Sequence, residues 1–331
     1  MAQVGVKHKS FFISIFILAF LAACQTEVKE KPAVIKPTVD VPQFNADSAY
    51  SYIAQQVAFG PRALGTKGHE ECAEYLIDKM SAFTDTVIVQ RGSVKTYDGK
   101  VHAFQNIIGS IKPELNNRIL ICAHWDTRPI ADHDTKRRDE PILGANDGGS
   151  GVGVVLELAR QLNTMDPKMG VDFILFDAED YGQPDGYRPY MENSYCLGSQ
   201  YWSNTPHVER YYARFGILLD MVGAENAKFT MEGTSMQFAP TLMKDIWNTA
   251  SALGYSGHFV SKRTKSIVDD HLYINQIAGI PTIDIIEYSE STPTNFGHYW
   301  HTHKDNMDII DRTTLKAVGQ TVLTYVVQEI H

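Results

Sequence analysis

The chain has 331 residues and a formal net charge of −9, from 39 acidic and 30 basic side chains. We therefore expect no nucleic-acid partner, because a protein needs a basic surface to displace counterions from phosphates. The stretch 43–331 has no internal repeat and no second linker, and its length suits one large α/β domain.

The first residues have the pattern of an export signal. Two lysines precede the apolar run 11–21, which is too short to span a bilayer, and small residues then lead to Cys24. The sequence Leu-Ala-Ala-Cys resembles the cleavage box of bacterial lipoproteins, in which the cysteine is lipidated. The alternative is an ordinary secretory signal with a chance cysteine. We predict a lipoprotein signal peptide over 1–23, with Cys24 as the lipidation site.

Residues 24–42 are predicted to form a flexible tether, because Lys, Glu, Pro, Val and Thr dominate there without apolar periodicity. The mature protein is then expected to be exported, in the periplasm or attached to the outer membrane, with the lipid as its membrane contact. Gln25 favours the outer membrane, since lipoproteins kept at the inner membrane often carry aspartate after the cysteine.

Beyond the tether, the spacing of apolar residues predicts alternating helices and strands. Helical spacing covers 46–57, 68–80, 151–162, 240–253 and 313–329. Short apolar runs typical of strands cover 104–111, 118–123, 171–176, 215–219 and 280–286. This order predicts an α/β fold, a three-layer sandwich in which helices flank both faces of a central mixed, mostly parallel β-sheet.

Three cysteines remain in the predicted domain, Cys72, Cys122 and Cys196. Their odd number excludes complete internal pairing, although one disulfide is compatible with an oxidising compartment. Their spacing gives no metal-ligand pattern. Cys122 lies in the apolar run 118–123, so we expect it in the core.

Polar side chains follow three of the predicted strands at the point where each strand ends. His124 and Asp126 follow 118–123, the acidic run 177–180 follows 171–176, and Asp220 follows 215–219. In parallel sheets the chemistry lies beyond the carboxyl ends of the strands, so these side chains are expected at one rim. Loops carrying Asp147 and His301 could reach the same rim.

Asp147, Asp180 and His301 offer oxygen and nitrogen ligands of the kind that a catalytic zinc ion prefers. Asp147 could instead cap the helix that follows it. Glu179 adjoins Asp180 and suits general acid–base work, since neighbouring side chains at a strand end diverge. A solvated acidic turn is the alternative for this pair. The cluster 269–271 is open between a structural cap or salt bridge and a functional role.

Six short motifs taken in order resemble the zinc aminopeptidase and glutaminyl cyclase superfamily, from about Pro61 to the C-terminus. They are His124-x-Asp126, residues 144–147, residues 177–180, residues 219–223, Asp269-Asp270-His271 and Trp300-His301-Thr302. The resemblance implies a zinc enzyme of one of two branches. The aminopeptidase branch would hold two ions on His124, a bridging Asp147, Asp180, Asp220 and His301.

Three details favour the bacterial glutaminyl cyclase branch: Trp300 directly before His301, the 269–271 triplet, and Phe296 four residues before Trp300. Asp180 departs from animal cyclases, which have glutamate there. This branch implies one zinc ion held by Asp147, Asp180 and His301. It also implies catalytic roles for Glu179, Asp220 and Asp269, and substrate binding by Trp300 and Phe296. The presence of His124 leaves a second ion open.

The activity implied is conversion of N-terminal glutamine in peptides or proteins to pyroglutamate, with release of ammonia. The first alternative is a two-zinc aminopeptidase that removes N-terminal residues. The second is a binding lipoprotein that keeps the fold without the chemistry.

Overall fold

The computed structural model describes residues 1–5 and 39–331, so most of the predicted signal peptide, Cys24 and most of the predicted tether lie outside the described residues. The chain divides into two units, Met1–Pro37 and Thr38–His331, and every helix and strand described belongs to the second. The main helices are α1 (Ala46–Ala58), α2 (Lys67–Phe83), α3 (Gly149–Asn163), α4 (Leu197–Asn204), α5 (Gly233–Phe238), α6 (Pro240–Ala252), α7 (Asp270–Tyr273) and α8 (Arg312–Ile330). A π-helical turn, η1 (Ile274–Ala278), and a 3₁₀ turn, η2 (Met307–Ile309), complete the helical segments.

Six strands form the central sheet in the order β1-β2-β4-β3-β5-β8. They are β1 (Thr86–Lys95), β2 (Val101–Ile111), β3 (Arg118–His124), β4 (Gly170–Phe176), β5 (Gly216–Asp220) and β8 (Thr282–Ile286). The β1–β2 and β2–β4 pairs are antiparallel, whereas β4, β3, β5 and β8 run parallel to one another. A second, two-stranded sheet pairs β6 (Phe229–Met231) with β7 (Phe259–Arg263). The predicted mixed, mostly parallel sheet is confirmed.

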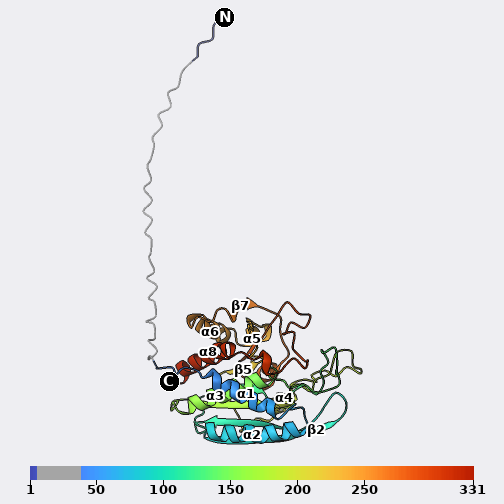
Figure 1. The fold of residues 1–331 in the computed structure, drawn as a ribbon. Coiled ribbons are helices and arrows are strands. Elements are labelled where there is room, and N and C mark those ends of the chain that lie inside the picture. The colour runs from blue at the N-terminus through green and yellow to red at the C-terminus, as the bar shows by residue number, and fades with distance from the viewer. Residues whose placement is uncertain (6–38) are drawn as a thin grey trace. The chain divides into compact units, whose positions relative to one another are not determined.

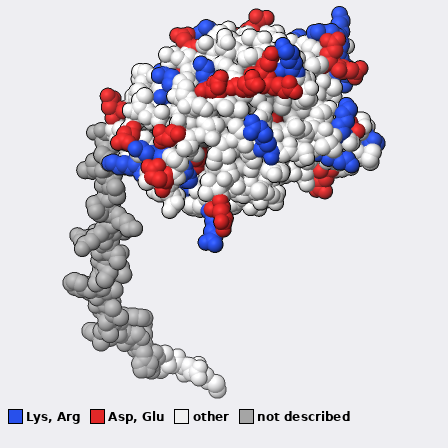
Figure 2. Space-filling view, turned by 90° about the horizontal axis from the view of Figure 1, so that it is seen from below, with Lys and Arg blue, Asp and Glu red and all other residues white. Residues whose placement is uncertain are grey.

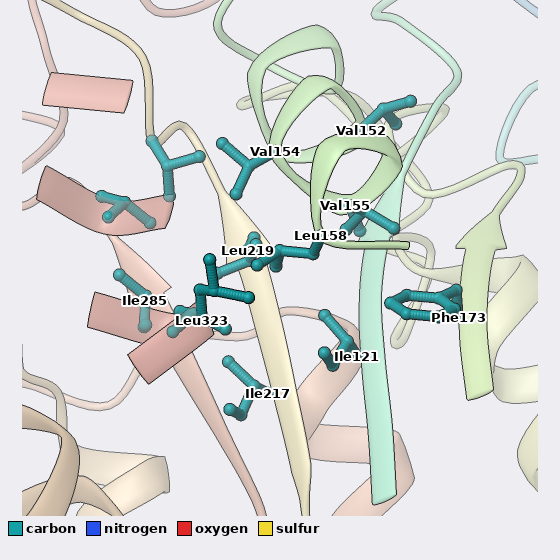
Figure 3. Close-up of a cluster of buried hydrophobic side chains, with 14 of the residues drawn as sticks. Ile121, Val152, Val154, Val155, Leu158, Phe173, Ile217, Leu219, Ile285 and Leu323 are labelled. Carbon is teal, nitrogen blue, oxygen red and sulfur yellow. The ribbon is translucent and has the colours of Figure 1, made fainter. Parts of the chain in front are cut away.

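The four parallel strands are buried along their whole length because helices cover both faces of the sheet. On one face, alternate strand residues pack with α1, α2, α3 and α8, which lie together in Figure 1. Figure 3 shows part of this layer, where Ile121, Phe173 and Leu219 meet Leu158 of α3 and Leu323 of α8. Each fully buried side chain of this size contributes about 1.5–3 kcal/mol.

The intervening strand residues face the opposite way and form a smaller core. Leu120, Ile174 and Leu218 pack there with Trp202 of α4 and Ile274 of η1. This division follows from the two-residue period of a strand, which places successive side chains on opposite faces. Two-sided burial also explains why these strands read as continuous apolar runs in the sequence.

A glycine sets the distance between α3 and the sheet. A Cβ atom on Gly151 would lie 2.0 Å from the carbonyl oxygen of Leu219, so only glycine permits this approach. The start of α3 is thereby held against the end of β5. Asp147 and Asp220 are consequently close in space although 73 positions separate them in the sequence.

The ten predicted helices and strands are all present, with boundaries within three residues of those predicted. The prediction omitted β1, α4 and the segments around the small sheet. β1 lies at the sheet edge with exposed and half-buried residues in turn, so it lacks a continuous apolar run. α4 contains glycine, serines and asparagine, which have weak helical propensity.

Cys72, Cys122 and Cys196 are buried free thiols, and Cys122 lies in the core as predicted.

On the face shown in Figure 2, basic and acidic side chains are interspersed. Within 1–5 and 39–331, no helix combines the length and apolar character that crossing a bilayer requires.

Candidate active site and metal centre

Non-glycine residues with left-handed backbone angles occur where the site-bearing segments turn. Ala178 (φ 58°) follows β4 and precedes Glu179, Met221 (φ 46°) follows Asp220, and His301 itself has φ 55°. Such conformations are uncommon for residues other than glycine and persist only where the surrounding structure enforces them. The backbone is therefore fixed at three points around the carboxyl rim of the sheet.

Asp147, Asp180 and His301 meet at this rim, as predicted. Their ligand atoms all lie within 4.8 Å of one another, and each residue is at most 3% exposed. The His301 Nε2 atom is 3.2 Å from Asp180 Oδ1 and 3.8 Å from Asp147 Oδ2. We name these three residues cluster A.

The residues of cluster A fit a zinc ion. Asp147 Oδ2 and Asp180 Oδ2 are buried without a hydrogen-bond partner, which is costly for a carboxylate unless a cation compensates it. Burial, together with the charge of Asp147, raises the pKa of Asp180 to about 6. Two carboxylates and one imidazole are a donor set that zinc favours, and they leave a coordination position for substrate.

Asp132 and Arg128 hydrogen-bond to residues of cluster A and hold them in position. With Nε2 facing the carboxylates, the His301 Nδ1 atom carries the proton and donates to Asp132 Oδ1 at 3.1 Å. Arg128 holds the other oxygen of Asp132 at 2.7 Å and also donates to the carbonyl oxygen of Asp180. Although burial raises the pKa of Asp132, hydrogen bonds from His301 and Arg128 lower it well below its ordinary value.

Two further buried aspartates fix the backbone of the ligand-bearing loops. Asp126 accepts from the amide groups of Glu179 (3.0 Å) and Asp180 (3.1 Å). Asp305 accepts from the amide of Asp147 at 3.0 Å and from that of the preceding residue at 2.7 Å. Each loop is therefore held through its main chain, which leaves its side chains free to face the cavity.

The alternative readings of two predicted ligands are wrong. The residue at the N-cap position of α3 is Gly148, and no side chain caps this helix, so Asp147 does not act as its cap. Glu179 and Asp180 do not form a solvated turn, because both are buried. Asp269 does cap α7, accepting from the amide of Asp270, and it also faces the cavity.

His124, Asp147 and Asp220 form a second group, cluster B, whose ligand atoms also lie within 4.8 Å of one another. The His124 Nε2 atom is 3.1 Å from Asp147 Oδ1 and 3.2 Å from Asp220 Oδ1. Burial lowers the pKa of His124, but the neighbouring carboxylates, Asp220 first, raise it well above its ordinary value. Asp147 thus belongs to both clusters, with one oxygen toward each.

Glu179 lies beside both clusters without joining either. Its Oε1 atom accepts from the Cys196 thiol at 3.2 Å, and its Oε2 atom lies 3.9 Å from His124 Nδ1. Burial raises the pKa of Glu179 well above its ordinary value, and the nearby charges of Asp180 and Asp269 add to this shift. A carboxyl group of this kind exchanges protons more readily near neutral pH than an exposed glutamate does.

Asp220 and Asp269 complete an acidic wall. Burial raises the pKa of Asp220 to about 7 and raises that of Asp269, whose Oδ2 atom has no hydrogen-bond partner. Asp284 of β8 lies near them, and burial together with the charge of Asp269 raises its pKa well above the ordinary value. Burial thus favours the protonated form of all three acids.

The residues of cluster A, together with Glu179, Asp220 and Asp269, line one cavity of about 320 Å³, and among the predicted site residues only His124 and the lipidation site are not part of its lining. Trp300 forms an aromatic wall, stacked on His301 with ring centroids 3.6 Å apart and 4.9 Å from the ring of Phe296. The cavity thus combines a carboxylate-rich floor with a flat apolar side.

The fold and the site together define a class of protein: a three-layer α/β protein with a cluster of candidate metal ligands at the carboxyl ends of its parallel strands. The chain belongs to peptidase family M28, which its residues 106–326 match.

Two proteins of solved structure and one further relative are similar to this chain. A glutaminyl cyclase from Bacteroides thetaiotaomicron, solved with N-acetylhistamine, is 54% identical with a TM-score of 0.84 and covers 86% of this chain and 98% of its own. A Zn-dependent exopeptidase from Parabacteroides distasonis is 48% identical with a TM-score of 0.86, covering 87% and 99%. Glutaminyl-peptide cyclotransferase from Bos taurus is 25% identical over 256 residues, which cover 69% of this chain and 67% of that protein.

The sequence did not identify Asp132, Asp305, Asp284 or Cys196 as parts of the site. Asp132 and Asp305 lie in irregular loops, and no periodic pattern there signals burial. Asp284 had a signal that could have been used, because it is the one charged residue in the apolar run 280–286. A lone charge within a buried strand requires a partner or a proton.

Proposed function

We propose that this chain is a zinc-dependent glutaminyl-peptide cyclotransferase, which converts the N-terminal glutamine of peptides to pyroglutamate and releases ammonia. The observation that carries the proposal is Glu179, a buried carboxyl group that adjoins cluster A without belonging to it and faces the same cavity. The cyclase at 54% identity supports the same activity.

Asp147, Asp180 and His301 would hold the ion, and zinc there would supply Lewis-acid polarisation of the carbonyl group of the glutamine side-chain amide. Glu179 accepts a proton from the α-amino group, whose nitrogen forms a bond to Cδ, the carbonyl carbon of the side-chain amide. The bond from that carbon to the amide nitrogen then breaks, and Glu179 returns the proton to the departing ammonia. Because nucleophile and electrophile belong to one residue, correct placement supplies much of the acceleration.

The other predicted residues hold the substrate and its charge. Asp220 and Asp269 hold shared protons near the oxygen on which negative charge develops, which stabilises the reacting state. Trp300 and Phe296 pack against the apolar stem of the glutamine side chain and exclude water from it. The site cavity needs to hold only the glutamine residue, because the reacting nitrogen and carbon both belong to that residue.

Glu179→Gln tests the assignment of the base. The variant keeps the shape of the side chain and every cluster A residue, so it should retain zinc while kcat falls by about 10²–10⁴-fold. Ammonia release from a Gln-initiated peptide measures turnover, and elemental analysis measures zinc. Glu140→Gln, at an exposed position, is the control. Turnover near the parent rate with zinc retained would contradict the role of Glu179.

The second candidate is a two-zinc aminopeptidase, which cluster B favours because Asp147 could bridge two ions. Two ions per chain, together with release of the first residue from peptides, would support it. Absence of any change in the peptide would instead support the binding lipoprotein.

Export also belongs to the proposal. The basic start, the apolar run 11–21 and Cys24 support a lipoprotein of the periplasm or outer membrane, anchored by lipid alone. Its substrates would then be exported proteins and peptides with N-terminal glutamine. Radiolabelled palmitate incorporation that Cys24→Ala abolishes is the expected result.

A further inference from the structure

A second cavity, of about 590 Å³, adjoins the site cavity. The two share Tyr195, Thr294 and Trp300 in their walls. Cyclisation uses only the first residue of a peptide, so the rest of the chain must cross the rim of the site cavity. The shared wall at Trp300 offers one such route, and its aromatic ring can pack against the aliphatic part of a long side chain.

The second cavity is lined by two carboxylates, from Asp132 and Asp185, and by no lysine or arginine of the described residues. The charge of Asp132 is compensated by Arg128 and His301. Asp185 is exposed and has no ion-pair partner within the described part of the chain. The uncompensated charge in this cavity is therefore negative.

Other parts of the rim carry different charges. Exposed Lys265 lines the site cavity and would repel a cation leaving on its side. A third cavity, of about 560 Å³, shares Tyr195 and Val268 with the site, but Arg188 lines it and would repel a cation there. The cavity beside Trp300 is thus the most favourable place for a positive side chain.

We infer that the cavity beside Trp300 is a subsite for the residues that follow the N-terminal glutamine, and that Asp185 makes it prefer a cationic side chain. The inference rests on the proposed function and names the substrate class for the same site: peptides with lysine or arginine soon after the glutamine. The aliphatic part of the lysine or arginine side chain packs on Trp300, and its charged end is attracted to Asp185. These two interactions together account for the preference.

The experiment compares kcat/KM for Gln-initiated tripeptides with lysine, leucine or glutamate at the second or third position. At pH 8 and at low salt, lysine should exceed glutamate by about two- to fivefold, the scale of one exposed ion pair. High salt should remove the difference. Asp185→Asn should abolish it and Asp185→Lys should reverse it.

Two controls separate this inference from the proposed function. Glutamine amide has no second side chain, so the Asp185 variants should cyclise it at the parent rate. Asp139→Lys makes the same charge change at an exposed residue that lines neither cavity, and it should leave the preference intact. If Asp185→Lys keeps the parent preference, or if the parent protein shows none, the subsite is wrong although the function stands. If the parent protein does not cyclise glutamine amide, the proposed function itself fails.

Discussion

Clusters A and B share Asp147 and have similar ligand types, yet their hydrogen bonding differs. In cluster A, the Oδ2 atoms of Asp147 and Asp180 lack a hydrogen-bond partner, and Asp132 orients the imidazole of His301. In cluster B, the His124 Nε2 atom reaches both carboxylates directly, whereas its Nδ1 atom lies 3.6 Å from Asp126 Oδ1, longer than an ordinary hydrogen bond to an orienting partner. A metal-binding histidine almost always has such a partner. We therefore expect an ion in cluster A, whereas a protonated His124 can satisfy cluster B.

The largest expected effect comes from removing one histidine of each cluster. His301→Gln should lose zinc and lower kcat/KM by about 10³-fold or more, because zinc supplies several kcal/mol of charge stabilisation. His124→Gln should keep one equivalent of zinc. Elemental analysis and peptide cyclisation assays measure both. Equal loss of zinc in the two variants would remove the distinction between the clusters.

The support behind cluster A gives the next largest effect. Asp132→Asn should weaken zinc affinity by about 10–100-fold, since it removes the carboxylate that orients His301. Competition with a chelator measures the affinity. The matched control is Asp134→Asn, which changes a similar carboxylate–histidine pair, with His303, outside the cluster. Unchanged affinity in Asp132→Asn would show that His301 needs no orientation from this residue.

A smaller effect is expected at Cys196, the hydrogen-bond donor to Glu179. Cys196→Ala should lower kcat about 3–10-fold with little change in KM, the scale of one hydrogen bond, and Cys196→Ser should restore it. Cys72→Ala, another buried thiol away from the cavity, is the control. A loss of similar size in Cys72→Ala would indicate general destabilisation instead.

The smallest effect concerns pH and the loop that carries Asp147. Burial, with the charge of Asp147, raises the pKa of Asp305 to about 7, well above its value in the unfolded chain. Between about pH 4 and 7 the folded state then binds more protons than the unfolded state. The free energy of unfolding of the metal-free protein should therefore fall as pH rises through this range. Asp305→Asn should make the fall shallower in urea titrations, and an unchanged slope would contradict the assignment.

The sequence predicted most of the helices and strands, and the site residues that directly follow strands. The buried strands read as apolar runs, and the rule that sites lie at carboxyl ends of parallel strands brought Asp180 and Asp220 to one rim. Loop residues such as Asp132 and Asp305 act through contacts with segments distant in the sequence, 169 and 158 positions away, so local patterns could not identify them. For Asp269 the sequence left a structural and a functional role open. The residue has both positions, because it caps α7 and also lines the site cavity.

We propose that one metal ion on cluster A serves ring closure and not peptide trimming. Mass spectrometry of a Gln-initiated peptide, after incubation with protein of known zinc content, tests it most directly. We expect a product lighter by one ammonia that keeps every residue, formed by protein with one zinc ion per chain. A peptide lacking its first residue, formed by protein with two ions per chain, would contradict it.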